Sequence, residues 1–150
     1  MLLNYTSKST KDTENIGMKL AEILSDNKVS RTFIALFGEM GVGKTAFTRG
    51  FCSKLSIDSV KSPTYTVLNE YKGTALVHHF DFYRITDEDD LYSIGYDDIA
   101  ESEGYCIGEW SENIVDMLPE NYVSVRISRV DFSSESESER AIEISIPFLD

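Results

Sequence analysis

Apolar residues recur at helical spacing in two parts of the chain, and a short apolar run lies between them. Along residues 9–24 this spacing follows a Ser/Thr start with acids in the first turn, which predicts a helix. Residues 32–38 are apolar and end at a glycine, as in a buried strand. Residues 44–55 carry a second helical stripe. The pattern therefore predicts a strand, a glycine-containing loop and a helix in succession.

The second half of the chain is rich in runs that favour strands. Residues 65–71 and 74–83 flank Lys72-Gly73, so we expect an antiparallel hairpin with this two-residue connection. Further strands are expected over residues 105–110, 122–130 and 141–146.

Two more helices are expected between these strands. Residues 86–95 are typical of a capped acidic helix that begins after Thr86. Residues 111–118 are typical of a helix that begins at Ser111 and stops before Pro119. No internal repeat or linker divides the chain. We therefore expect one domain over residues 1–150, in which the polar, acidic segment 131–140 forms a mobile loop.

The loop after the first predicted strand contains the pattern G-x-x-x-x-G-K-[ST], as Gly38, Gly43, Lys44 and Thr45. Its glycines let successive backbone N–H groups point inward, and the following helix adds its positive end. Lys44 would reach the β- and γ-phosphates of a nucleotide, and the Thr45 hydroxyl would bind Mg²⁺. The fold class is therefore α/β: a P-loop NTPase-like domain with a central, mostly parallel sheet, flanking helices and antiparallel hairpin elements.

Such a loop also needs acids to hold Mg²⁺ and to orient water. Asp81 follows the run ALVHHF and Glu109 follows YCIG, each where a strand should end. Either could hold the metal while the other positions the nucleophile, and surface acids at strand ends are the alternative. Thr64, on an extended segment after Pro63, is a candidate for a metal-touching threonine, although a proline turn explains the same residues.

Charge is distributed unevenly along the chain. The net charge is −12, and no Lys or Arg lies between Ile85 and Val125, where twelve acidic residues stand. The rest of the chain is therefore neutral. An acidic surface repels a phosphate backbone, which argues against independent binding of nucleic acid. The stretch is either a solvated helix face or a docking surface for a basic partner protein.

Features that the sequence lacks indicate where the protein is located in the cell and which metal sites are not expected. No apolar run has membrane-spanning length, and the start MLLNYTSKST lacks the apolar stretch of a signal peptide, so we expect a cytoplasmic protein without membrane contact. Cys52 and Cys106 lie far apart without a CxxC pattern, and we expect buried free thiols. With no histidine–cysteine pairing, we expect no zinc site and interpret His79 as a packed strand histidine.

The motifs of known nucleotide-binding proteins help to decide which class of function this sequence fits. The GTPase patterns D-x-x-G and N-K-x-D are absent, so GTP specificity lacks support. The arginine-bearing lid usual in small-molecule kinases is also absent, so a kinase is disfavoured but open. A nucleotide-gated adaptor, in which hydrolysis is incidental, is the non-enzyme alternative.

Four segments taken together are more specific than the phosphate loop alone. GEMGVGKTAFTRG, VKSPTYTVLNEY, HHFDFYR and GEW, in this order, resemble the TsaE (YjeE-type) family between about Ser9 and Pro119. The resemblance implies a small ATPase, weak alone, of bacterial tRNA threonylcarbamoyladenosine biosynthesis. By this resemblance, the protein would act with TsaB and TsaD, which would transfer a threonylcarbamoyl group to adenosine 37 of tRNA. ATP hydrolysis would reset the complex of these partners. The protein would contact tRNA mainly through them, and we expect no binding to DNA.

The resemblance also implies roles for individual residues. Thr45 and Glu109 would hold Mg²⁺, Asp81 would support water or metal, and Lys44, Asp81 and Glu109 would carry catalysis. The residues expected to contact ATP are Ser9, Thr13, Gly38, Glu39, Met40, Gly41, Val42, Gly43, Lys44, Thr45, Ala46, Thr64 and Trp110. Within this set, Ser9 and Thr13 would lie near the base and Trp110 at the edge of the site.

This chain departs from the family pattern in two places. Many relatives have Asp-Leu and Ala where the loop has Glu39-Met40 and Val42, which should not disturb backbone contacts to phosphate. Residues 131–140 have no counterpart. No role is therefore assigned past Pro119, including to Arg126 and Arg129.

Overall fold

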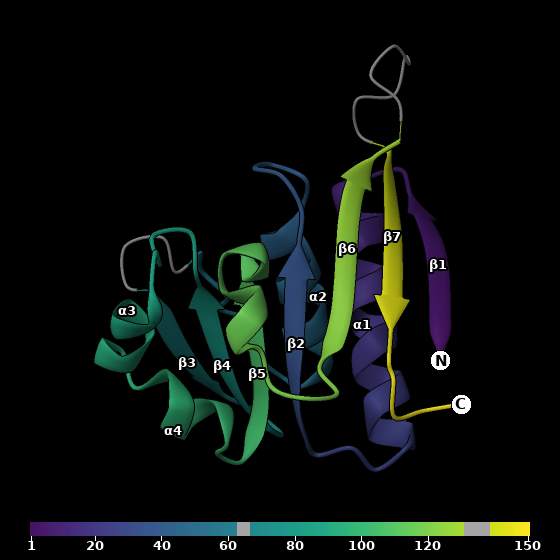
Figure 1. Ribbon diagram of the computed structural model, residues 1–150. Helices are drawn as coiled ribbons and strands as arrows, with labels where there is room; N and C mark the ends of the chain where they lie inside the picture. Colours follow the sequence, from purple (N-terminus) through teal and green to yellow (C-terminus); the bar gives the residue numbers. More distant parts are fainter. Residues whose placement is uncertain (63–66, 131–138) are drawn as a thin grey trace.

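The computed structural model describes residues 1–62, 67–130 and 139–150, and within them seven strands form one sheet in the order β1-β7-β6-β2-β5-β4-β3 (Figure 1). The elements are β1 (Leu2–Ser7), α1 (Thr10–Asp26), β2 (Arg31–Phe37), α2 (Lys44–Lys54), β3 (Leu68–Lys72), β4 (Leu76–Asp81), α3 (Glu88–Ser93), α4 (Tyr96–Ala100), β5 (Gly104–Glu109), the 3₁₀ helix η1 (Ser111–Met117), β6 (Val123–Arg129) and β7 (Arg140–Ser145).

The sheet is parallel at its centre and antiparallel at both edges. Strands β6, β2, β5 and β4 run side by side in the same direction, whereas β3 pairs antiparallel with β4, and β7 pairs antiparallel with β6 and β1. The predicted α/β class with a mostly parallel sheet is confirmed. The parallel strands end at one edge of the sheet, above which the loop from β2 to α2 lies (Figure 1).

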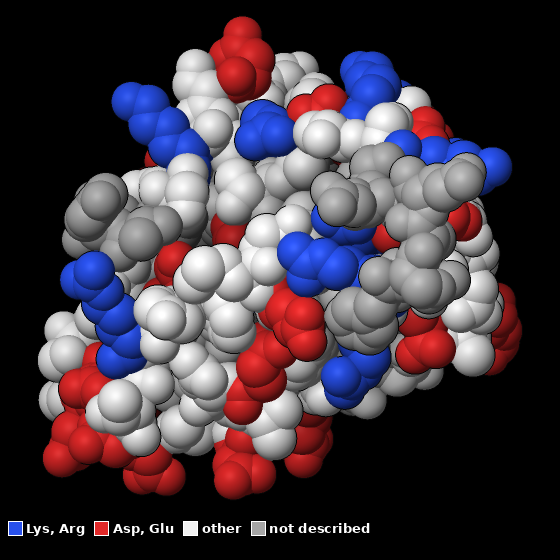
Figure 2. Space-filling model, turned by 90° about the horizontal axis from the view of Figure 1, so that it is seen from above, with Lys and Arg blue, Asp and Glu red and all other residues white. Residues whose placement is uncertain are grey.

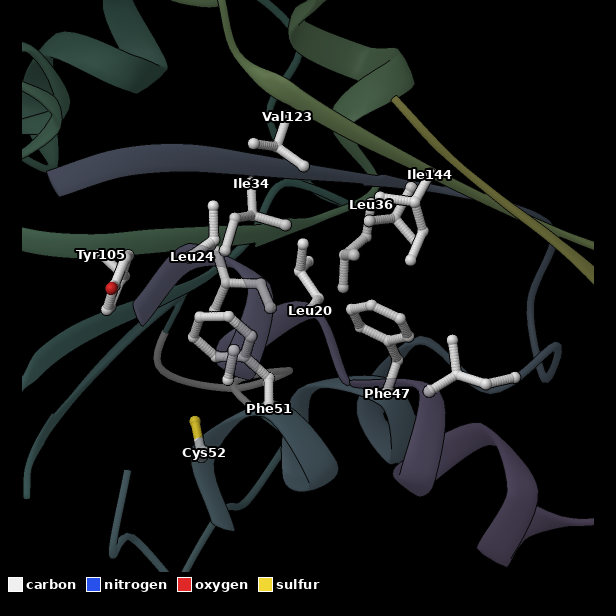
Figure 3. Close-up of a cluster of buried hydrophobic side chains, with 14 of the residues drawn as sticks. Leu20, Leu24, Ile34, Leu36, Phe47, Phe51, Cys52, Tyr105, Val123 and Ile144 are labelled. Atoms are coloured by element: carbon white, nitrogen blue, oxygen red, sulfur yellow. The ribbon is translucent and has the colours of Figure 1, made fainter. Parts of the chain in front are cut away.

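Each face of the sheet buries its own apolar layer. Helices α1 and α2 cover one face, where Leu20, Phe47 and Phe51 are fully buried against Ile34 of β2 (Figure 3). Phe33, Phe80 and Phe82 belong to the other layer, which α3, α4 and η1 cover. Because both faces of the central strands are covered, the sequences of those strands are continuous apolar runs and do not alternate between apolar and polar residues. Within the described residues, no helix combines the length and apolarity needed to cross a membrane.

Helices α1 and α2 pack with backbone against backbone. A Cβ atom at Gly17 would lie 2.2 Å from the carbonyl oxygen of Phe47, and one at Gly50 would lie 1.8 Å from that of Glu14. Both distances are below van der Waals contact, so only glycine permits this approach. An ion pair between Arg49 Nε and Glu14 Oε2, at 3.0 Å, spans the same contact.

Four expectations about secondary structure need correction. Strand β1 was not expected, because an exposed edge strand is defined by its pairing with distant β7 rather than by its own pattern. Helix α4 is only five residues long and was also missed. The hairpin connection has three residues, 73–75, since Lys72 still pairs with Leu76 and Thr74 N–H bonds to the carbonyl of Leu55.

The fourth correction concerns the helices around the acidic stretch. Helix α3 starts later than expected because Asp87, not Thr86, caps it by accepting the N–H of Asp90. The segment after Ser111 is a 3₁₀ helix, interrupted at Ile114. Segment 131–140, expected as a mobile loop, lies almost entirely outside the described residues. Cys52 and Cys106 are buried and free, as expected, and burial raises the pKa of both thiols to about 12.

The acidic stretch lies mainly on the surface of α3 and α4. Its exposed acids there and just beyond are Asp87, Glu88, Asp89, Asp97, Asp98, Glu101 and Glu103. Seen from the edge where the parallel strands end, acidic side chains gather along the lower left and lower rim of the molecule (Figure 2). Glu109 differs from these residues because it is buried, at 5% exposure.

Candidate functional site

A cavity of about 520 Å³ lies where β4 and β5 end and α2 begins. Its walls are Thr10, Met40, Gly41, Gly43, Lys44, Thr45, Ala46, Arg49, Ser62, Asp81, Tyr83, Glu109 and Trp110. Ligands of open parallel sheets bind at this edge, because the strand-to-helix loops meet there. Nine of the residues predicted from the sequence therefore come together around one hollow.

The phosphate-loop sequence forms the turn between β2 and α2. Gly41 and Gly43 have φ angles of 77° and 116°, in the left-handed region that glycine adopts at little cost. Gly43 is also the N-cap of α2 and has no side chain that could accept a hydrogen bond from the first helical N–H groups. These N–H groups and the helix dipole give the cavity a wall of positive potential.

Lys44 is the buried cation of the cavity, at 5% exposure. Its Nζ donates to the carbonyl oxygen of Gly38 at 2.5 Å and lies 3.5 Å from the centre of the Trp110 ring. Burial lowers the pKa of Lys44, and the nearby carboxylates of Glu112, Glu109 and Asp81 oppose this shift. Burying an ammonium group costs free energy, which anionic phosphate would recover.

Glu109 is held from two sides. The Thr45 hydroxyl lies 3.0 Å from its Oε1 and 3.1 Å from its Oε2, and Nε2 of the fully buried His79 lies 2.6 Å from Oε2. The hydroxyl of Tyr71 lies 3.3 Å from Nδ1 of the same histidine. His79, expected to be a packed strand histidine, is indeed buried in its strand, but it also orients the Glu109 carboxylate.

Asp81 stands beside Glu109 as the last residue of the neighbouring strand. The two residues are register partners across β4 and β5, and Asp81 Oδ1 accepts the N–H of Tyr83 at 2.9 Å. Burial raises the pKa of the Asp81 carboxyl, the Tyr83 hydrogen bond lowers it, and neighbouring Glu109 raises it. Two carboxylates and one hydroxyl thus meet at one end of the cavity.

The donor atoms at this end are all hard oxygens, which suits Mg²⁺. Residues 1–62, 67–130 and 139–150 contain no group of three or more His, Cys, Asp or Glu that could hold a metal by itself. This arrangement also suits Mg²⁺, which uses one or two carboxylates and takes its other ligands from water and substrate phosphates. The Thr45 hydroxyl and the two carboxylates therefore fit the ion as a partner of bound nucleotide.

The other predicted residues are placed less directly. Ser9 caps α1 by accepting the N–H of Asp12 and does not line the cavity, whereas its neighbour Thr10 does. Thr13 is buried and shares a hydrogen bond of 2.7 Å with Ser7, and a Cβ at Gly43 would lie 3.5 Å from its methyl group. Thr64 lies outside the described residues.

The remaining loop residues surround the cavity without lining it. Gly38 donates its N–H to Glu112 Oε2 at 3.0 Å, and the Glu39 side chain is exposed beside Arg129. Val42 is buried in the apolar layer of α1 and α2. Trp110, by contrast, forms part of the cavity wall, and its ring lies 4.9 Å from that of Tyr83.

Several residues of the site were not predicted from the sequence. Tyr83, Arg49 and Ser62 line the cavity, and Glu112 accepts the first N–H of the loop. Tyr83 follows Asp81 by two residues, and this spacing after a predicted strand end was a usable signal. Glu112 lies 74 residues from Gly38, and no local pattern connects the two.

Comparison with known proteins gives a consistent result. A family model described as threonylcarbamoyl adenosine biosynthesis protein TsaE matches residues 7–142. The chain is similar to the tRNA threonylcarbamoyladenosine biosynthesis protein TsaE of Treponema pallidum, with 32% identity over 83% of this chain and 90% of the relative. The protein of the same name from Bacillus subtilis is 38% identical over 85% of this chain and 78% of its own length.

A solved structure has the same fold. The crystal structure of Bacillus subtilis YdiB superposes with a TM-score of 0.72 and 25% identity, over 97% of this chain and 86% of that one.

Proposed function

This chain belongs to the TsaE family, and from that premise we propose that it is a Mg²⁺-dependent ATPase of tRNA threonylcarbamoyladenosine biosynthesis. It binds ATP–Mg²⁺ in the cavity beside the phosphate loop and hydrolyses it slowly alone. Hydrolysis resets a complex of the TsaB and TsaD type, which modifies adenosine 37 of tRNA. The protein works in the cytoplasm and contacts tRNA mainly through these partners.

One observation carries the proposal. The hydroxyl of Thr45, at the start of α2, lies within 3.1 Å of both carboxylate oxygens of Glu109, at the end of β5. A phosphate loop, a hydroxyl after its lysine and an acid at a neighbouring strand end are the parts that P-loop NTPases use for ATP and Mg²⁺. All three line one cavity of about 520 Å³.

The contacts suggest how the residues serve the reaction. Lys44 exchanges the Gly38 carbonyl for β- and γ-phosphate oxygens, and the loop N–H groups hold the same phosphates. Thr45 and Glu109 would hold the cation, which would supply positive charge to stabilise the transferred phosphoryl group. Asp81 orients a water molecule whose oxygen attacks the γ-phosphorus. The bond from that phosphorus to the β–γ bridging oxygen breaks, so that ADP and inorganic phosphate leave.

The test is release of inorganic phosphate from ATP by the purified protein. It is measured alone and with TsaB- and TsaD-type partners plus unmodified tRNA, with Lys44→Ala as the control. We expect slow release alone, a marked increase with partners and tRNA, and no increase for the variant. Phosphate transferred to a small acceptor instead would indicate a kinase. Sustained tRNA modification by a variant that binds but cannot hydrolyse ATP would indicate an adaptor.

A further inference from the structure

Two arginines from the antiparallel edge of the sheet reach the phosphate loop. Arg129 ends β6 and Arg140 begins β7, and the two residues are register partners in the ladder between these strands. A second cavity, of about 390 Å³, lies on the β6 side of the loop, and Gly38, Glu39, Val42 and Arg129 line it. The loop is therefore flanked by the nucleotide cavity on one side and by β6 on the other.

Both arginines bond to carbonyl oxygens of the loop. Arg140 Nε donates to the carbonyl of Val42 at 3.1 Å. Arg129 Nη2 donates to the carbonyl of Met40 at 3.4 Å, while its Nη1 lies 3.3 Å from Glu39 Oε2. Hydrogen bonds from a charged donor are stronger than neutral ones, so these contacts restrain the peptide groups that they hold.

A peptide unit is planar, and in the trans form its C=O and N–H point in opposite directions. No cis peptide bond occurs in the parts of the chain that the structure describes. The carbonyl of Met40 shares its peptide unit with the N–H of Gly41, and the carbonyl of Val42 shares its unit with the N–H of Gly43. Holding these carbonyls toward β6 and β7 turns both N–H groups away from those strands. Gly41 and Gly43 both line the nucleotide cavity.

We propose that Arg129 and Arg140 are positioning residues for the phosphate site. They fix the carbonyls of Met40 and Val42 and thereby aim the N–H groups of Gly41 and Gly43 at bound phosphate. This inference rests on the proposed function, because it supposes that phosphate binds at the loop. It explains how two N–H groups can be held in place in a loop whose glycines, Gly41 and Gly43, adopt the flexible left-handed region. It also gives the C-terminal strands a part in binding.

The first test is calorimetric titration of the full chain with ATP, and separately with inorganic tripolyphosphate, which lacks the nucleoside. Arg140→Met should weaken both ligands about 10-fold, and Arg129→Met should act in the same direction with a smaller effect. Arg126→Met is the matched control, because it removes a charge of the same kind from β6. Arg126 lies over the Phe37 ring, 4.4 Å from its centre, and within the described residues it makes no hydrogen bond to a loop carbonyl. This substitution should leave both affinities unchanged.

A loss for Arg126→Met as large as that for Arg140→Met would overturn the proposal, because charge alone would then explain the effect. Unchanged affinity in both Arg129→Met and Arg140→Met would overturn it as well. If Arg140→Met does not fold, judged by its circular dichroism, Arg129→Met alone decides between these outcomes.

A second test does not depend on any ligand. The protein is labelled with ¹⁵N-glycine, and the amide signals of its nine glycines are compared between wild type and Arg140→Met. The signal of Gly43 should shift because its peptide plane is released, while those of the distant Gly95 and Gly104 should not. An unmoved Gly43 signal would overturn the inference. Failure of the wild type to bind ATP or tripolyphosphate would instead contradict the proposed function, and the two failures are therefore distinguishable.

Discussion

The two ends of the central strands carry cavities of almost equal size but different chemistry. The cavity where the strands end measures about 520 Å³, and the one where β2 begins measures about 540 Å³. The first contains the buried charged residues Lys44, Asp81 and Glu109. The charged residues of the second, Arg31, Glu101 and Glu120, are all exposed. Volume therefore does not distinguish a candidate site from a surface hollow, whereas the burial of charge does.

The difference has a physical cause. A buried charge weakens folding unless partners compensate for lost hydration, and an exposed charge costs little. At the end of the strands, the cost falls on residues that a nucleotide and its cation would stabilise. At the beginning of the strands, water solvates the charges, so they add little to the free-energy cost of folding. Substitutions of matching residues in the two cavities should therefore have unequal effects.

The largest expected effect is on nucleotide affinity. Lys44→Ala should weaken ATP binding by about 100-fold or more, because it removes charge-assisted hydrogen bonds to two phosphate groups. Arg31→Ala removes a cation from the other cavity and should change affinity by less than about twofold. Isothermal titration calorimetry measures both. Equal losses in the two variants would show that overall charge, not the phosphate loop, governs binding.

The next effect separates hydrolysis from binding. Glu109→Gln keeps the size of the side chain but weakens its hold on a cation, so phosphate release should fall about 100-fold while ATP affinity falls far less. Glu120→Gln, in the other cavity, should leave both unchanged. Asp81→Asn should reduce release with little effect on the Mg²⁺ requirement. If only Asp81→Asn altered that requirement, the roles of the two acids would be reversed.

The smallest effect is on stability and its pH dependence. Because burial raises the pKa of Asp81 above its ordinary 3.8, the folded state holds its proton more tightly than the unfolded state does. Stability therefore falls as pH rises through the folded pKa, and the ionised carboxylate weakens the fold at neutral pH. Asp81→Asn should raise stability at pH 7 by about 1 kcal/mol, or Tm by about 2–4 °C.

This gain should disappear in acid below about pH 3.8, where Asp81 is protonated in both states. The exposed Glu101→Gln serves as the control and should change stability little at either pH. Thermal unfolding followed by circular dichroism at both pH values measures the difference. A gain of equal size in acid would mean that ionisation of Asp81 is not its cause.

Much of the site could be predicted because its parts are local in sequence. The phosphate loop is one contiguous run, and the strand ends at Asp81 and Glu109 follow from nearby apolar patterns. What could not be predicted depends on distant contacts. The bond of Glu112 to Gly38 spans 74 residues, and that of Arg140 to Val42 spans 98. Strand β1 likewise exists through its pairing with β7. Periodicity describes a face of one element and not the neighbour that it will meet.

The contact of Gly17 and Gly50 between α1 and α2 has a consequence for mutational tolerance. Neither glycine lines the cavity beside the phosphate loop, yet a single methyl group at either would push the two helices apart. Since Lys44 and Thr45 begin α2, such a displacement would carry them away from Glu109. A search for inactivating substitutions should therefore find loss of activity at these positions, although glycine has no side chain that could take part in the reaction.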